Sequence, residues 1–82
     1  MTALPDGKQP DIPLGRYRHY KGPFYEVIGL ARHSETEEWL VVYRTLYGAY
    51  DLWVRPAAMF SEEVLVDGRQ VARFTHVPPD TA

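Results

Sequence analysis

Cysteine is absent from the 82 residues, which excludes a disulfide framework and a cysteine-based zinc site. Long hydrophobic runs are absent too, because no stretch approaches the roughly 20 consecutive apolar residues of a membrane span. The first residues, MTALPDGKQPDIPLG, do not have the charged and then apolar order of a secretory signal. We therefore expect a cytoplasmic protein with no membrane segment, stabilised by side-chain packing alone.

An excess of either charge is also missing. Lysine and arginine total 9 and aspartate and glutamate total 11, for a formal net charge of −2, whereas non-specific nucleic-acid binding needs a cationic surface. Apolar residues make up 45% and charged residues 24% of the chain, proportions typical of a folded domain. A chain of this length forms one domain with a small core, as a monomer or a weak homo-oligomer.

The two ends of the chain lack any apolar period. Residues 1–14 hold Pro5, Pro10 and Pro13, and we expect a mostly disordered N-terminal arm with Ile12 and Leu14 as its points of contact with the domain. A single domain is then expected over residues 15–77, followed by a flexible tail over residues 78–82.

Between these ends the sequence is typical of short β-strands. In residues 24–34, FYEVIGLARHS, alternation places Val27 and Gly29 on one face and Leu30 on the other, and Gly29 is expected to mark a bulge or a tight bend. Asp67-Gly68, between two alternating apolar runs, predicts a type I′ hairpin. The other expected elements are strands in GRYRHYKG, WLVVYRTLY and GAYDLWVRP, a polar loop at SETEE and one helical turn in AAMFSEEV.

Five or six short strands with tight turns favour an all-β fold. An open sheet would expose long edges and bury one face only, so we expect a closed or half-closed antiparallel barrel of the SH3-like or Tudor-like kind. An OB-like barrel is the alternative, and it normally needs a longer helix between strands than AAMFSEEV provides.

The order of the segments GRYRHYKG, YEVIGLARHSETEE, VVYRTLYG, LWVRPAAMF and a terminal RF carries a family resemblance. Together they resemble a bacterial family of short stand-alone proteins known as domain of unknown function 1653, over roughly residues 15–74. The combination of YRHYKG, HSET, YRTLYG and WVRP is specific. The resemblance implies a small β fold and no mechanism.

Two histidines are the candidates for chemistry. His19 and His33 end successive strands and are therefore expected at opposite ends of a hairpin, which disfavours a shared metal site, and we expect no metal and no cofactor. A small hydrolase-like enzyme using His33 with Glu35, or His19, is one hypothesis. The alternative is that both histidines hold loops by hydrogen bonds, and no catalytic signature is recognisable.

Tyrosines and tryptophans are too numerous for a small core to bury with every O–H and N–H satisfied, so several must reach the surface. Cations and aromatics concentrate in the first four strands, and acids concentrate in SETEE and SEE. We predict a binding module for a protein or peptide partner, with single-stranded RNA or a nucleotide second, and a structural subunit pairing through a strand edge as a third alternative. The candidate binding residues are Tyr17, His19, Lys21, His33, Tyr47, Trp53 and Arg55.

Overall fold

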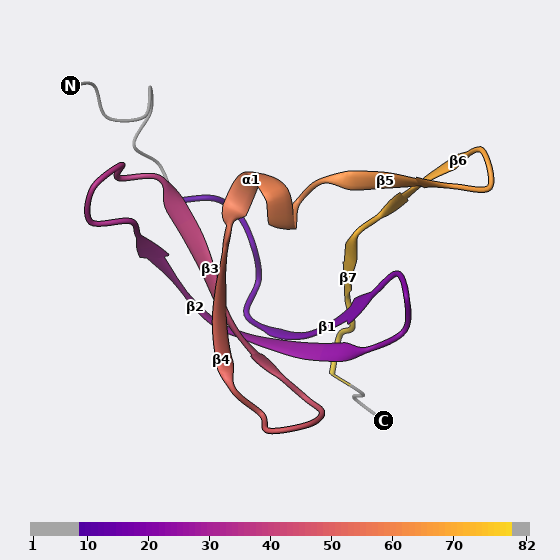
Figure 1. Ribbon diagram of the computed structural model, residues 1–82, viewed down its shortest axis with the longest axis horizontal. Helices are drawn as coiled ribbons and strands as arrows, with labels where there is room; N and C mark the ends of the chain where they lie inside the picture. The colour runs from indigo at the N-terminus through magenta and orange to yellow at the C-terminus, as the bar shows by residue number, and fades with distance from the viewer. Residues whose placement is uncertain (1–8, 80–82) are drawn as a thin grey trace.

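The computed structural model describes residues 9–79. Five strands form one antiparallel sheet in the order β4-β3-β2-β1-β7, and the other two strands form a separate hairpin (Figure 1). The elements along the chain are β1 (Gly15–His19), β2 (Phe24–Arg32), β3 (Trp39–Thr45), β4 (Leu52–Pro56), α1 (Ala57–Phe60), β5 (Glu63–Val66), β6 (Arg69–Ala72) and β7 (Phe74–His76).

The prediction of a small all-β antiparallel domain is confirmed, with seven strands among the described residues and a sheet that stays open between β4 and β7. The additional strand arises because the run VARFTHV divides at Arg73. The Arg73 amide still donates to the Glu62 carbonyl (3.1 Å), which continues the register of the β5–β6 pair. From Phe74 onward the chain pairs with β1 instead, with Phe74 opposite His19. The last strand therefore joins the first.

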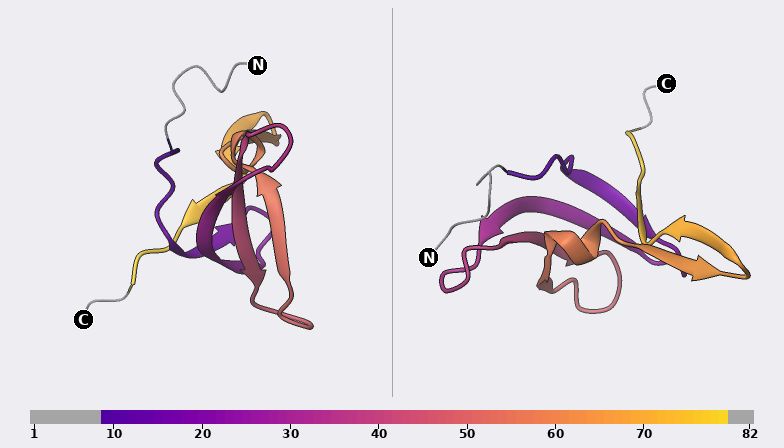
Figure 2. Two further views of the ribbon diagram at one scale, coloured as in Figure 1. Left: turned by 90° about the vertical axis from the view of Figure 1, so that its left-hand side faces the viewer. Right: turned by 90° about the horizontal axis from the view of Figure 1, so that it is seen from above.

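Strand β2 bends along its length (Figure 2) because it contains a β-bulge. The register against β3 shifts between Val27 and Gly29, as expected for a glycine in mid-strand. One extra residue turns every later side chain to the other face. The simple alternation of the sequence was therefore wrong for Leu30, which pairs with Val41 and packs against the core beside Val27.

The β5–β6 hairpin has the predicted turn. Asp67 and Gly68 have φ values of 50° and 79°, so both turn residues lie in the left-handed region that a type I′ turn requires. The hairpin extends away from the five-stranded sheet (Figures 1 and 2), and Leu65 on it is 70% exposed.

Aromatic rings dominate the core on the concave side of the sheet. The Phe60 ring of α1 stacks on the Phe74 ring of β7 at 4.2 Å and 5°, and Tyr17 meets Phe60 edge-on at 5.1 Å. The Tyr17 hydroxyl donates to the Pro13 carbonyl (2.8 Å), and burial followed by the charge of Asp11 raises the pKa of this phenol. The buried apolar residues are Tyr17, Val27, Val41, Tyr43, Ala57, Phe60 and Phe74.

The described part of the N-terminal segment lies against the domain. Ile12 packs on the core, as expected, whereas Leu14 is 58% exposed. The predictions for residues 1–8 and 80–82 lie outside the described residues. No helix within residues 9–79 is long and apolar enough to cross a membrane.

We expect Phe60→Ala to lower the free energy of unfolding by about 3–5 kcal/mol, because it removes the ring that stacks on Phe74. The measurement is urea denaturation followed by circular dichroism. Leu65→Ala is the matched control, and its effect should stay within about 0.5 kcal/mol because this side chain is exposed. Equal losses for the two variants would contradict the described core.

Candidate binding cleft

A cleft of about 350 Å³ opens on the concave side of the sheet, next to the loop between β3 and β4. Three strands contribute side chains to its walls. Tyr43 of β3 lies directly opposite Trp53 of β4, and Tyr25 of β2 lies opposite Thr45 of β3, so these side chains share one face of the sheet. Tyrosine, tryptophan and arginine provide most of its surface. The lining residues are Tyr25, Tyr43, Thr45, Tyr47, Gly48, Ala49, Asp51, Trp53 and Arg55.

Two other cavities lie elsewhere. A larger one, about 600 Å³, lies between Leu14 and the segment from His76 to Pro79, and one of about 400 Å³ lies between Pro10, Trp39 and α1. The cleft beside β4 is distinguished by its chemistry rather than by its volume, since it combines exposed aromatic rings with a guanidinium group.

A tyrosine pair forms one wall of the cleft. The hydroxyl oxygens of Tyr25 and Tyr47 lie 2.9 Å apart in a hydrogen bond, and the two rings meet edge to face at 5.6 Å. Burial, followed by this hydrogen bond, raises the pKa of Tyr25 to about 12. Both phenols are therefore held in a fixed arrangement, and Tyr47, which is 47% exposed, forms the rim.

Arg55 lines the cleft, and its charge is unpaired within residues 9–79. Its Cζ atom is 5.6 Å from the centre of the Phe74 ring, in a cation–π contact. Its Nε atom is buried and has no hydrogen-bond partner, and within residues 9–79 the side chain forms no ion pair. A guanidinium carries five N–H donors and no acceptor, so this group presents donors that the described part of the protein leaves unused.

Arg73 and His19 lie close to Arg55. Arg73 pairs with Glu62 through Nη2 (3.1 Å), but its Nε is buried without a partner. The His19 ring meets the Phe74 ring edge-on at 5.0 Å. Burial and then the charges of Arg73, Arg55 and Lys21 lower the pKa of His19, so all three cations lie close enough to act on this ring.

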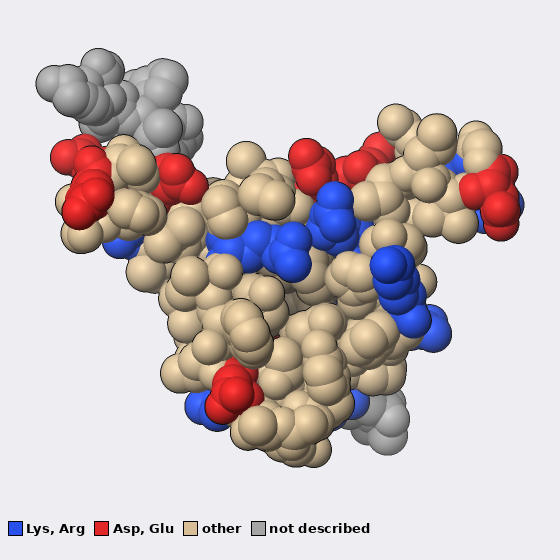
Figure 3. All heavy atoms as spheres, in the orientation of Figure 1, with Lys and Arg blue, Asp and Glu red and all other residues tan. Residues whose placement is uncertain are grey.

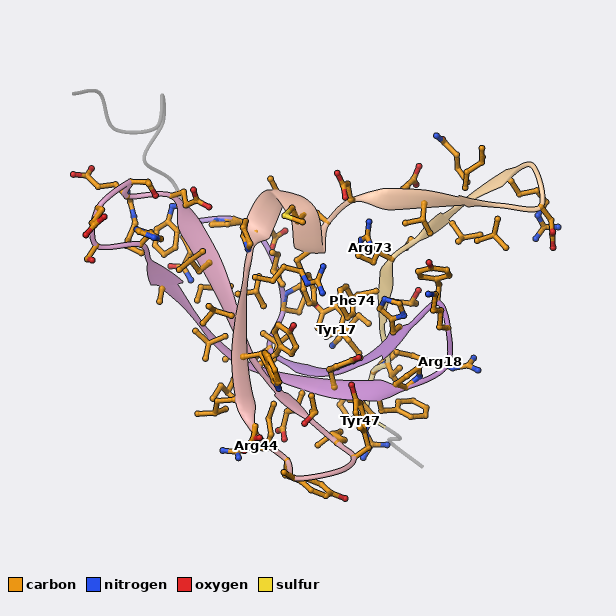
Figure 4. The ribbon with its side chains drawn as sticks, in the orientation of Figure 1. Tyr17, Arg18, Arg44, Tyr47, Arg73 and Phe74 are labelled. Carbon is orange, nitrogen blue, oxygen red and sulfur yellow. The ribbon has the colours of Figure 1, made fainter. Side chains whose placement is uncertain are left out.

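The surface view shows the same distribution of charge. In Figure 3 the Lys and Arg side chains form a band across the middle of one face, beneath α1 and β5, and the surface is hollowed next to the band. Asp and Glu gather mainly at the outer loops and hairpin. In Figure 4, Arg73 and Phe74 lie inside the curve of the sheet, whereas Arg18 and Arg44 point outward.

The structure brings five of the seven candidate binding residues to this region. Tyr47, Trp53 and Arg55 line the cleft. His19 contacts the neighbouring Phe74, and the backbone N–H of Lys21 donates to Nδ1 of His19 (3.2 Å). Segments that lie far apart in the sequence thus meet on one face.

The other two candidates lie apart from it. Tyr17 is only 5% exposed and belongs to the core. His33 lies in the β2–β3 loop, at the far end of β2 from His19, and its Nδ1 accepts the backbone N–H groups of Glu35 (3.0 Å) and Thr36 (3.2 Å). These bonds give His33 a role in holding the loop. Within residues 9–79 no three His, Asp or Glu side chains converge to hold a metal ion.

Sequence reasoning missed Arg73 and Phe74, which it placed in a terminal hairpin strand. Their position depends on the pairing of β7 with β1, where His19 lies opposite Phe74. Tyr25 and Tyr43, which were not among the candidate binding residues, pack in or against the core and also line the cleft. The RF segment of the family resemblance was the one signal that could have drawn attention to the first pair.

The fold and the cleft define a small all-β domain built on one strongly curved antiparallel sheet. The chain belongs to the family described as "Protein of unknown function (DUF1653)", whose model matches residues 15–76, and this confirms the predicted resemblance. A crystal structure of a DUF1653 protein from Bordetella bronchiseptica is 38% identical, with a TM-score of 0.77 over 88% of this chain and 95% of that chain. No curated protein matches the sequence.

We expect an NMR titration to give His19 a pKa below the free value of about 6.5. The unfolded chain, in which His19 has its ordinary pKa, is protonated at a higher pH than the folded chain. The free energy of unfolding should therefore fall as the pH drops from about 6.5 through the folded pKa. Arg73→Gln removes one of the charges that act on the ring and should raise the pKa of His19. Arg69→Gln, on the β6 strand, is the matched control and should leave it unchanged, and an equal response would contradict the described surroundings of His19.

Proposed function

We propose that this protein is a non-catalytic binding module whose cleft takes an acidic segment of a protein partner that carries an apolar or aromatic side chain. The observation that carries the proposal is the unpaired guanidinium of Arg55 beside half-exposed aromatic rings. An SH3-like interpretation of the fold agrees with this function, since such curved sheets present aromatic grooves to extended peptides.

The unused donors favour an anionic group in the ligand. A carboxylate bound to a guanidinium forms charge-assisted hydrogen bonds, about twice as strong as neutral ones, and Arg55 has donors that no group within residues 9–79 uses. Arg55 and Arg73 both have a buried, unpartnered Nε, and both act on the same His19 ring. A carboxylate bound to Arg55 in the cleft would also feel the charge of Arg73, because both guanidinium groups act on the neighbouring His19 ring.

The aromatic rim favours an apolar neighbour of that carboxylate. Trp53 is 54% exposed and Tyr47 is 47% exposed, and both stand at the opening of the cleft. Large rings of this kind supply contact area at low entropic cost and are enriched where proteins bind one another. A volume of about 350 Å³ accommodates one or two side chains rather than a folded surface.

Single-stranded RNA or a nucleotide is the second candidate. A half-exposed indole beside cations can stack a base while the cations hold a phosphate. The net charge of −2 makes this candidate weaker, because long nucleic acid would meet repulsion outside the basic band. Salt separates the two candidates, since phosphate-dominated binding weakens steeply as salt is added.

We expect a short peptide of Asp and Glu around one Phe to shift the NMR signals of the Trp53 indole N–H and the Arg55 Nε–H. The same peptide with Asn and Gln should shift them far less. Bound carboxylates should also raise the pKa of His19, because they offset the charges that lower it. Arg55→Gln should weaken binding about tenfold or more, the usual cost of losing one charged hydrogen bond.

Arg69→Gln serves as the control for net charge, because Arg69 lies in the β5–β6 hairpin outside the cleft. If the acidic peptide and the amide peptide bind equally well, the carboxylates of the ligand do not contribute to binding and this part of the proposal is wrong. A response to a short RNA alone, lost with moderate salt, would replace the peptide by the second candidate. If neither the peptide nor the RNA shifts the NMR signals of the cleft residues, the proposed binding function is wrong.

A further inference from the structure

Strand β4 is an edge strand with an unusual surface. Within residues 9–79 it pairs with β3 and with no other strand. Leu52, Trp53 and Val54 are 52%, 54% and 58% exposed, so both faces of the strand are apolar and open. Natural proteins normally protect such edges with charge, proline or covering loops, because an exposed apolar edge pairs with other strands.

The backbone of β4 offers a defined set of outward groups. The Thr45 amide donates to the Asp51 carbonyl (3.1 Å), which makes this a hydrogen-bonded position of the β3–β4 ladder. Bonding positions recur at every second residue of an antiparallel pair. The two residues that fall between them, Leu52 and Val54, therefore direct their N–H and C=O groups away from β3 and towards the open edge.

We propose that β4 pairs with β4 of a second copy of this chain, antiparallel, about a two-fold axis at Trp53. In this register Leu52 faces Val54 of the second copy, and Val54 faces its Leu52. Both residues direct their backbone groups outward, so each of these two pairs can exchange both N–H···O=C bonds. The two five-stranded sheets would form one continuous sheet across the axis.

The side chains of β4 are complementary to themselves in this register. On the convex face, Leu52 meets Val54 of the second copy. On the concave face, the two Trp53 rings meet at the axis, and Asp51 lies opposite Arg55 of the second copy, twice by symmetry. Apolar, aromatic and opposite-charge cross-strand pairs all stabilise a sheet. Such a self-complementary patch is what an isologous two-fold interface requires.

Neighbouring registers lose either the backbone hydrogen bonds or the side-chain complementarity. An axis at Val54 would place Leu52 opposite Pro56, which has no N–H to donate, and would remove the contact between Asp51 and Arg55. An axis at Leu52 would leave Arg55 opposite a residue of the β3–β4 loop. A second copy of the chain, rather than a foreign peptide, therefore fits this edge best.

The pairing differs from the proposed function and does not depend on it. Asp51, Trp53 and Arg55 also line the cleft, so the clefts of two copies would open side by side at the axis. In the dimer the Asp51 carboxylate of the second copy would use part of the Arg55 guanidinium, and Trp53 would be partly covered at the axis. The pairing and an acidic ligand would therefore share Arg55, whose five donors allow it to bind both.

Sedimentation of the full chain over a range of concentrations tests the pairing. We expect twice the chain mass at high concentration. Asp51→Arg and Arg55→Asp each place like charges opposite one another, and each alone should raise the dimer dissociation constant about tenfold or more. An equimolar mixture of the two variants restores opposite charges at both positions and should recover a dimer. NMR spectra of each variant alone would show whether it is folded.

A crosslink gives a second test that does not depend on charge. The chain has no cysteine, and residues facing at a non-hydrogen-bonded position lie about 4.5 Å apart between Cα atoms, within the range of a disulfide. Trp53→Cys should therefore form a disulfide-linked dimer on mild oxidation, whereas Ala58→Cys on α1 should not. A monomer at every concentration, or a dimer that neither the charge variants nor the crosslink affects, would overturn the pairing.

Discussion

The Phe74 ring is the contact on which most of this structure depends. It stacks on Phe60 of α1 at 4.2 Å, and it lies within 5.0 Å of the His19 ring and 5.4 Å of the Tyr25 ring. It also supports the Arg55 guanidinium. One side chain on the last strand thus joins the helix, the first two strands and the cation of β4. The Phe74 ring thus fills the space inside the curved, open sheet, between α1 and the first two strands.

The core and the cleft share their side chains because the chain is so short. A domain of this size buries a smaller fraction of its surface than a large one, and no disulfide compensates for it. Tyr25 packs against the core with its ring and lines the cleft with its hydroxyl. Arg55 covers Phe74 and presents its donors to the cleft. The core and the lining of the cleft are therefore built from the same few aromatic and cationic groups.

Local features of the fold were predictable from the sequence, and non-local ones were not. The Asp67-Gly68 turn, the Gly29 bulge and the helical turn depend on residues that are neighbours in the chain, so their chemistry is visible there. The side on which Leu30 lies depends on how one extra residue at the bulge is accommodated. The candidate site followed the same division. Tyr47 and Trp53 were identified from their own local segments, whereas Phe74 comes next to Tyr25 and Arg55 through the pairing of β7 with β1.

That pairing of the first strand with the last also governs when the domain can fold. During synthesis, β1 to β4 leave the ribosome well before Phe74, and until then His19 lacks its cross-strand partner and Phe60 lacks the ring on which it stacks. Contacts between such distant parts of a chain slow folding, because loop closure must precede them. A nascent chain that stops short of β7 would expose the aromatic side of its sheet, so this small protein completes its core and its cleft in one late step.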